Sequence, residues 1–148
     1  MTENEIKKTI EIDASQEAVF KAISDPVELT NWFPDAAILE PKVGGKFELS
    51  FYKDSKKPKM KMDRDFHNEG RVLEFIPNKK LVYTWRWKEM TGFPDTIVTW
   101  ELEQDKNKTR VTLTHSGFTG KEEGPASVQE HNMGWSFFLN ELVSYCKK

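Results

Sequence analysis

Alternating aromatic side chains constrain this chain more than any other feature of its sequence. In the segment from residue 81 to 87, Tyr83, Trp85 and Trp87 occupy every second position. The segments 96–102 and 109–115 alternate in the same way. A period of two is typical of a strand with one buried face. We therefore predict antiparallel hairpins whose aromatic face has to be covered by another element.

The same pattern predicts strands elsewhere and helices between and after them. The predicted strands are 6–12, 37–40, 46–51, 66–76, 81–87, 96–102 and 109–115. Glycine adopts positive φ at little cost, so Gly44 and Gly45 predict a turn or bulge. Residues 53–61 and 116–127 are rich in charge, proline or glycine, which predicts loops.

Three helices are expected. Ser15 is a suitable N-cap for a helix that runs to residue 24. Asp25 followed by Pro26 predicts a second, short helix over residues 25–33. The third is a long amphipathic helix over residues 127–146, the one predicted element long enough to cover the sheet. The pattern predicts an α+β domain in which a curved antiparallel sheet wraps around the C-terminal helix.

The composition agrees with a single folded domain over residues 1–148. The chain has a mass of 17.3 kDa, with 10 Phe, 5 Trp and 3 Tyr, which is too aromatic for a disordered chain. Cys146 is its one cysteine, so no internal disulfide and no paired-cysteine metal motif can form. His67, His115 and His131 show no metal-ligand spacing, and the sequence predicts neither a metal nor a cofactor.

The charge and hydropathy patterns exclude several classes of partner. A net charge of -2 and a pI near 6.0 argue against nucleic-acid binding. No apolar run approaches the roughly 20 residues that span a bilayer, so stable membrane insertion is not expected. The first 13 residues contain no apolar signal segment. We therefore expect a cytoplasmic protein.

Motifs spread over nearly the whole chain resemble a known family. In order, they are Ala18-Val19-Phe20-Lys21-Ala22-Ile23, Asp25-Pro26, Leu29-Thr30-Asn31-Trp32-Phe33, Val43-Gly44-Gly45-Lys46-Phe47, Gly70-Arg71-Val72-Leu73-Glu74, Pro77 with Leu81-Val82-Tyr83-Thr84-Trp85, Thr109-Arg110-Val111-Thr112-Leu113-Thr114-His115, and Gly134-Trp135 with Leu139 and Leu142. This set resembles the SRPBCC superfamily, whose START-like domains have the helix-grip fold. Within it, the chain is most similar to the branch named after the C-terminal domain of the activator of the ninety-kilodalton heat-shock protein ATPase. The resemblance implies a helix-grip fold, and a function among lipid and hormone binding, polyketide cyclisation and co-chaperone activity.

A curved sheet around one helix leaves concave apolar space, which is the usual form of a small-molecule site. We predict that the chain binds a hydrophobic or amphipathic small molecule there, without catalysis. Tyr83 and His115 are the first candidates for fixing the orientation of the ligand. The predicted cavity residues are Trp32, Phe33, Phe47, Phe51, Tyr83, Trp85, Trp87, Trp100, His115, His131, Trp135 and Phe138.

Two other functions stay open. A cyclase-like or hydrolase-like enzyme in the same cavity needs an inward acid–base pair. His115, His131 and Glu74 are the candidates, and Glu74 shares a predicted face with Val72 and Ile76. A protein-interaction module acting on a chaperone would instead use an exposed outer surface. The eponymous activator has a second, chaperone-binding domain that 148 residues do not accommodate, which counts against this alternative.

Overall fold

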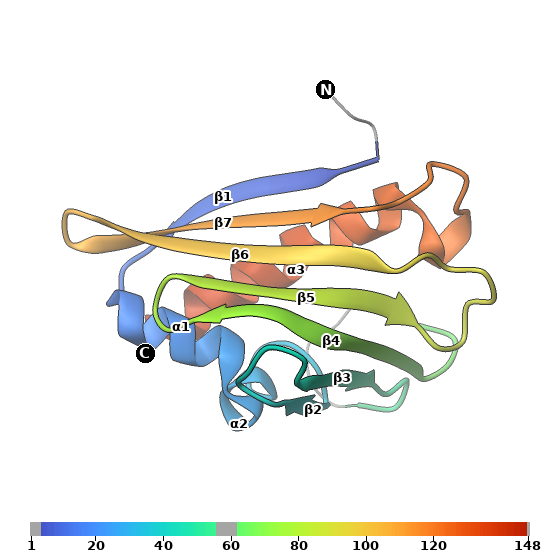
Figure 1. Ribbon diagram of the computed structural model, residues 1–148, viewed down its shortest axis with the longest axis horizontal. Helices are drawn as coiled ribbons and strands as arrows, with labels where there is room; N and C mark the ends of the chain where they lie inside the picture. The colour runs from blue at the N-terminus through green and yellow to red at the C-terminus, as the bar shows by residue number, and fades with distance from the viewer. Residues whose placement is uncertain (1–3, 56–61, 148) are drawn as a thin grey trace.

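Seven strands form one antiparallel sheet in the order β1-β7-β6-β5-β4-β3-β2 (Figure 1). The structure is a computed structural model that describes residues 4–55 and 62–147. Residues 56–61 of the predicted loop lie outside the described residues. The strands are β1 Ile6–Ile12, β2 Ala36–Leu39, β3 Lys46–Phe51, β4 Phe66–Ile76, β5 Lys80–Trp87, β6 Thr96–Asp105 and β7 Lys108–Ser116. All seven agree with the predicted segments to within a few residues, and β1 at one edge pairs with β7.

The helices are α1 Gln16–Ser24, α2 Pro26–Leu29, the short 3₁₀ turn η1 Gly124–Ala126, and α3 Val128–Cys146. The two predicted caps, Ser15 and Asp25, are confirmed, and the structure adds a third at the start of α3. The Ser15 hydroxyl accepts from the Ala18 N–H at 3.1 Å, and the Asp25 carboxylate caps α2. The Ser127 hydroxyl caps α3 in the same way. These side chains satisfy amide groups that a helix start leaves without partners.

The second helix is shorter than predicted: α2 ends at Leu29, and the chain continues in turns. Trp32 and Phe33 are the reason, because both are buried and their rings stack with centroids 5.0 Å apart. Side chains of consecutive residues point in different directions on an α-helix, so a helix could not place both rings this way. The Trp32 indole also donates to the Ala22 carbonyl at 2.8 Å, which fixes the turn against α1.

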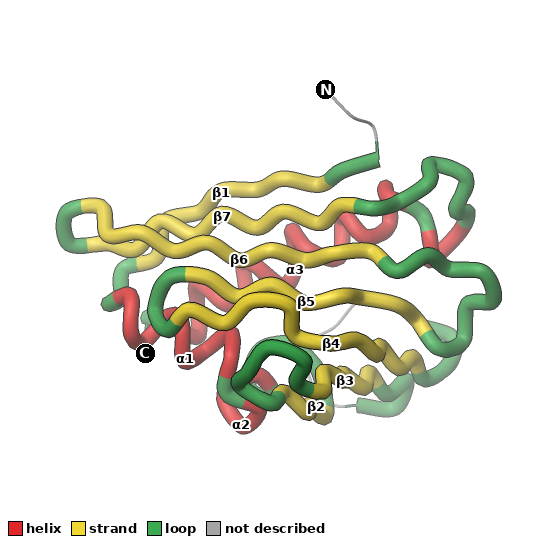
Figure 2. Tube along the Cα trace, in the orientation of Figure 1, coloured by secondary structure: helices red, strands yellow, loops and turns green. Residues whose placement is uncertain are grey.

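The long helix α3 lies across one face of the sheet, with α1 and α2 beside its C-terminal end (Figures 1 and 2). Leu142 and Leu139 on α3 are buried in the same core as Val111 and Leu113 on β7. The curved sheet, the covering helix and the two short helices after β1 confirm the predicted helix-grip fold. Of the helices in the described ranges, none is long and apolar enough to cross a membrane.

A bulge in β4 reverses one predicted orientation. The pairing of β4 with β5 shifts register between Val72 and Glu74. Val72 is fully buried opposite Tyr83, whereas Glu74 and Ile76 are exposed. The prediction that Glu74 shares an inner face with Val72 and Ile76 is therefore wrong, because a register shift of one residue moves the following side chains to the opposite face. Glu74 lies outside the inner face and pairs with Lys80 at 3.5 Å.

Close contact between β4 and β5 makes Gly70 irreplaceable without distortion. A Cβ atom on Gly70 would lie 2.0 Å from the Thr84 carbonyl oxygen. We expect Gly70→Ala to lower the free energy of unfolding by about 3 kcal/mol, because backbone has to move to relieve the clash. Urea denaturation measures the change. Gly134→Ala is the control, since a Cβ there meets no atom within 4 Å. Equal stabilities of the two variants would contradict the prediction.

Candidate ligand-binding cavity

A cavity of about 630 Å³ lies between the N-terminal half of α3 and strands β3, β4 and β5. This volume lies within the range of roughly 300–1,000 Å³ that is typical of small-molecule sites. Aromatic side chains are the largest group in its wall, and polar residues from the loops and α3 also contribute. The lining residues are Phe33, Phe51, Lys53, Met62, Asp63, Phe66, Trp85, Trp87, Met90, Pro125, Glu130, His131, Gly134, Trp135 and Phe138.

The predicted cavity residues divide into two groups. Those that line the cavity are Phe33, Phe51, Trp85, Trp87, His131, Trp135 and Phe138. Those that do not line it are Trp32, Phe47, Tyr83, Trp100 and His115, all of which are buried in the core. Tyr83, for example, stacks on Phe47 and accepts a hydrogen bond from the Trp100 indole at 3.0 Å. Phe47, Tyr83, Trp100 and His115 lie on strands and Trp32 lies in the turns after α2, and other side chains fill the space around all five.

Several lining residues were not identified from the sequence. Phe66 alternates with buried Asn68 on β4, and this periodicity could have indicated an inner position. Met62 and Met90 lie outside the regular strands, where no periodic signal exists. Gly134 belongs to the Gly134-Trp135 motif of the sequence. A glycine in the middle of a long helix is a detectable signal, because glycine weakens helices.

His131 on α3 is held by hydrogen bonds at both ring nitrogens. The Trp87 indole N–H donates to Nε2 at 2.8 Å. The Nδ1 atom lies 2.9 Å from the Ser127 carbonyl oxygen, so Nδ1 carries the proton and donates. This arrangement requires the neutral ring. Burial lowers the pKa of His131 to about 4, which agrees with that requirement.

His115 on β7 has a comparable arrangement with the opposite tautomer. The Trp135 indole N–H donates to Nδ1 at 2.9 Å, so the proton of the neutral ring is on Nε2. Nε2 lies 2.8 Å from the Thr96 hydroxyl, which in turn donates to the Trp85 carbonyl at 2.7 Å. Burial, and secondly the charge of nearby His131, hold the pKa of His115 well below its usual value.

These contacts limit the chemistry available to the two histidines. All four of their ring nitrogens are engaged within the protein, so neither ring presents a free base to the cavity. In the described ranges, no group of three or more His, Cys, Asp or Glu side chains could hold a metal ion. The arrangement is an aromatic wall in which the neutral His131 ring takes part and behind which the neutral His115 ring is buried.

The charged residues in the described lining are Lys53, Asp63 and Glu130. Asp63 is paired with Arg64, whose hydrogen bond and charge lower the pKa of the Asp63 carboxyl. Within the described parts of the chain, the Glu130 carboxylate has no ion-pair partner.

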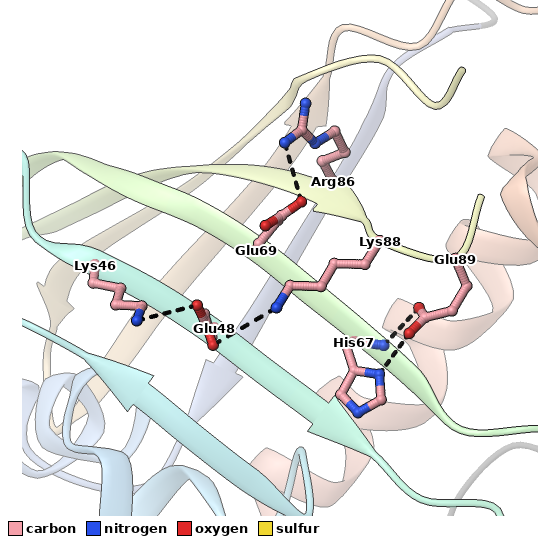
Figure 3. A network of polar contacts seen from close by, with 7 residues as sticks. All are labelled: Lys46, Glu48, His67, Glu69, Arg86, Lys88 and Glu89. Atoms are coloured by element: carbon pink, nitrogen blue, oxygen red, sulfur yellow. Dashed lines mark hydrogen bonds and ion pairs between the residues drawn. The ribbon is translucent and has the colours of Figure 1, made fainter. Parts of the chain in front are cut away.

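The opposite face of the sheet is charged and internally paired. Figure 3 shows ion pairs that link three neighbouring strands and the residues after β5. Glu48 on β3 contacts Lys46 at 3.5 Å and Lys88 at 4.0 Å. Glu69 on β4 contacts Arg86 on β5 at 3.0 Å. The two signs alternate across this face, so it does not present a field of one sign.

The match to a protein-family model decides the family. The model of the activator of Hsp90 ATPase homolog 1-like proteins matches residues 13–147. The chain belongs to this family. Comparison with curated proteins finds no similar sequence.

Solved structures show the same fold. A protein from Chromobacterium violaceum is 22% identical, with a TM-score of 0.83, and the match covers 99% of both chains. The Aha1 dimer from Colwellia psychrerythraea is 22% identical, with a TM-score of 0.74, over 99% of this chain and 96% of that one. An HSP90 activator from Plasmodium falciparum is 23% identical, with a TM-score of 0.70, over 93% and 92%. At these identities, the likeness supports the AHSA1-like fold and no particular activity.

Proposed function

We propose that this AHSA1-like protein binds a hydrophobic or amphipathic small molecule in the cavity, without catalysing its conversion. Gly134 is the observation that carries the proposal. It lies inside α3 and lines the cavity, and a Cβ there would meet no atom within 4 Å. An interior helix glycine costs about 1 kcal/mol relative to alanine. At this position, a larger side chain would stabilise the helix but would fill open space in the cavity.

Aromatic packing supports the same proposal. Phe33 contacts Phe138 and Trp135 with ring centroids 4.8 and 5.4 Å apart, which makes the wall rigid. A preformed wall lowers the entropic cost of binding. Each Å² of apolar surface that a ligand and this wall remove from water contributes roughly 25 cal/mol. The non-catalytic part of the proposal rests on His115 and His131, whose ring nitrogens are all engaged within the protein.

Filling the cavity tests the proposal. We expect Gly134→Phe to abolish ligand binding, or to weaken it more than tenfold, while the protein stays folded, because the added ring occupies the open space. Gly134→Ala is the matched control and is expected to bind normally and to gain about 1 kcal/mol of stability. Native mass spectrometry of protein from its own host identifies a bound ligand. Tryptophan fluorescence titrations with lipids, flavonoids and aromatic polyketides then measure affinity, since Trp85, Trp87 and Trp135 line the cavity.

Two outcomes would contradict the proposal. No bound mass and no saturable fluorescence change across the panel would show that the cavity does not hold such ligands. Undiminished binding to Gly134→Phe would show that the ligand binds elsewhere. Conversion of a bound ligand during the titration, followed by mass, would contradict the non-catalytic part alone.

A chaperone partner is the second candidate function. The family model supports it, and so do the names of two structural relatives, the Aha1 dimer from Colwellia psychrerythraea and the HSP90 activator from Plasmodium falciparum. It predicts that the protein raises the ATPase rate of the Hsp90 of its own host, and that Gly134→Phe does so equally well, because this function would use the outer surface. No change in the ATPase rate at saturating protein would exclude it.

A further inference from the structure

We propose that the cavity prefers a cationic ligand, a hydrophobic amine or quaternary ammonium compound, over a neutral or anionic one. This inference rests on the proposed binding function. It follows from what the described lining of the cavity and of the adjoining groove offers to a ligand. This lining consists mainly of aromatic rings and carboxylates, and few of its hydrogen-bond donors are free.

The donors of the cavity wall are already in use. Trp87 and Trp135 present indole rings to the cavity, but their N–H groups donate to His131 and His115. The His131 N–H donates to the Ser127 carbonyl. The Trp85 N–H is buried and has no hydrogen-bond partner among the described residues. An anion held against these rings would lack the N–H donors that it requires, and Lys53 is the one Lys or Arg side chain in the described lining.

What the described lining offers to a ligand is chiefly aromatic carbon, most of all on half-buried Trp87, because Trp85 and Trp135 are each only 3% exposed. A ring carries negative charge density above its plane, so a cation within about 6 Å of a ring centroid is attracted to it. The attraction is strongest for tryptophan and grows when the cation is desolvated. Trp85, Trp87 and Trp135 lie together in this wall, with centroids of Trp85 at 5.2 and 5.4 Å from the other two. A cation against the half-buried Trp87 ring would also lie near Phe51 and Phe66, whose ring centroids are each 5.7 Å from that of Trp87.

Carboxylates outnumber cations among the described charged residues of the cavity and of the groove beside it. Glu130 lines the cavity and has no ion-pair partner in the described ranges, whereas Asp63 is paired with Arg64. A polar groove of about 600 Å³ adjoins the cavity and shares Phe66, Met90, Pro125 and Asp63 with it. Among the described residues, the charged groups of the cavity and groove are the carboxylates Asp63, Glu89, Glu122, Glu123 and Glu130, against the cations Lys53, Arg64 and Lys121. Asp63 is paired with Arg64 and Glu89 with His67, so Glu130 is the carboxylate of the cavity lining that has no ion-pair partner in the described ranges. The negative excess attracts a cationic ligand and repels an anionic one.

Three probes with the same apolar chain test the preference. Isothermal titration calorimetry is carried out with decyltrimethylammonium, 1-decanol and decanoate, each below the concentration at which it self-associates. We expect decyltrimethylammonium to bind at least about tenfold more tightly than decanoate, with decanol in between. Gly134→Phe should abolish binding of all three, which places the probes in the cavity.

Glu130→Gln is the specific variant, and Glu141→Gln is its control on the same helix, away from the cavity lining. We expect Glu130→Gln to reduce the ratio of cation to anion affinity about threefold or more, and Glu141→Gln to leave it unchanged. Equal affinities for the three probes, or tighter binding of decanoate, would overturn the inference and leave the proposed function intact. Binding of none of the three would count against both.

Discussion

Replacing Trp135 with alanine is expected to lower the free energy of unfolding by about 4 kcal/mol. Trp135 is 3% exposed, and its ring lies against Phe33, Trp85 and Trp100 at centroid distances of 5.4 to 5.8 Å. The substitution removes these contacts and leaves a void. It also removes the donor to His115 Nδ1, which leaves a buried acceptor without a partner.

Trp135→Phe separates the two contributions. It keeps most of the aromatic packing and loses the N–H donor, so we expect a loss of about 1–2 kcal/mol. Urea denaturation at about pH 7.5, followed by circular dichroism, measures both variants. A loss below about 1 kcal/mol for Trp135→Ala would show that this region repacks freely and that the wall is not rigid. Because of its effect on stability, Trp135→Ala is a poor variant for testing binding, and Gly134→Phe is preferable.

The second large effect is a loss of stability in mild acid. Burial lowers the pKa of His131 to about 4, and the pKa of His115 is also below its usual value. The unfolded chain, with histidine pKa values near 6.5, therefore binds more protons than the folded chain once the pH falls below that value. Stability is complete above about pH 6.5 and decreases as the pH falls towards the folded pKa. His131 alone is expected to cost about 2 kcal/mol between about pH 7.5 and about pH 5, and His115 adds to this loss.

His131→Gln identifies the origin of this loss. A neutral amide can accept from the Trp87 indole and donate to the Ser127 carbonyl, so both hydrogen bonds can be kept without a titrating group. We expect the variant to lose about 2 kcal/mol less than the natural protein over the same pH range in urea denaturation. The measured range ends near pH 5 because the folded protein also holds the pKa values of the Glu89 and Glu122 carboxyls below their usual value. Below about pH 5, protonation of these carboxyls would lower the stability as well and would obscure the effect of His131. Identical pH dependence of the two proteins would refute the assignment to His131.

The secondary structure could be predicted from the sequence because local chemistry decides most of it. The hydroxyl of Ser15 and the carboxylate of Asp25 begin helices through contacts two or three residues away. The alternation of Tyr83, Trp85 and Trp87 reflects the pleat of a single strand. One covering helix and several aromatic strands can build a core in only a few ways. The fold class could therefore be predicted from the predicted elements.

Two features could not be predicted from the sequence. One is which inner-face residues of the sheet line the cavity, and the other is the register of β4 after its bulge. The alternation places Tyr83 and Trp85 on the same face, but only packing against α1, α2 and α3 decides that Trp85 lines the cavity and Tyr83 is core. The bulge between Val72 and Glu74 has no local signal, since it depends on how β4 pairs with β5, where Leu73 is the extra residue without a register partner.

The indole–imidazole pairs show the same limit. Trp87 and His131 are 44 residues apart, and His115 and Trp135 are 20 apart. The sequence suggested that both histidines approach the cavity, where they could orient a ligand or act as acid and base. Their actual role in the structure is to accept from tryptophan, which depends on ring orientations that no spacing rule encodes.

The pairing of β1 with β7 sets the order of events during synthesis. Ile6 lies opposite His115, so the first strand cannot complete its ladder until the seventh has emerged. At roughly 5–20 residues per second, the intervening chain takes on the order of 5–20 seconds to be made. Throughout that delay, the apolar Ile6, Ile10 and Ile12 lack their neighbours, and the high contact order of this closure makes it slow even in the finished chain. Substitutions that weaken β7 should therefore reduce the yield of soluble protein more than its equilibrium stability.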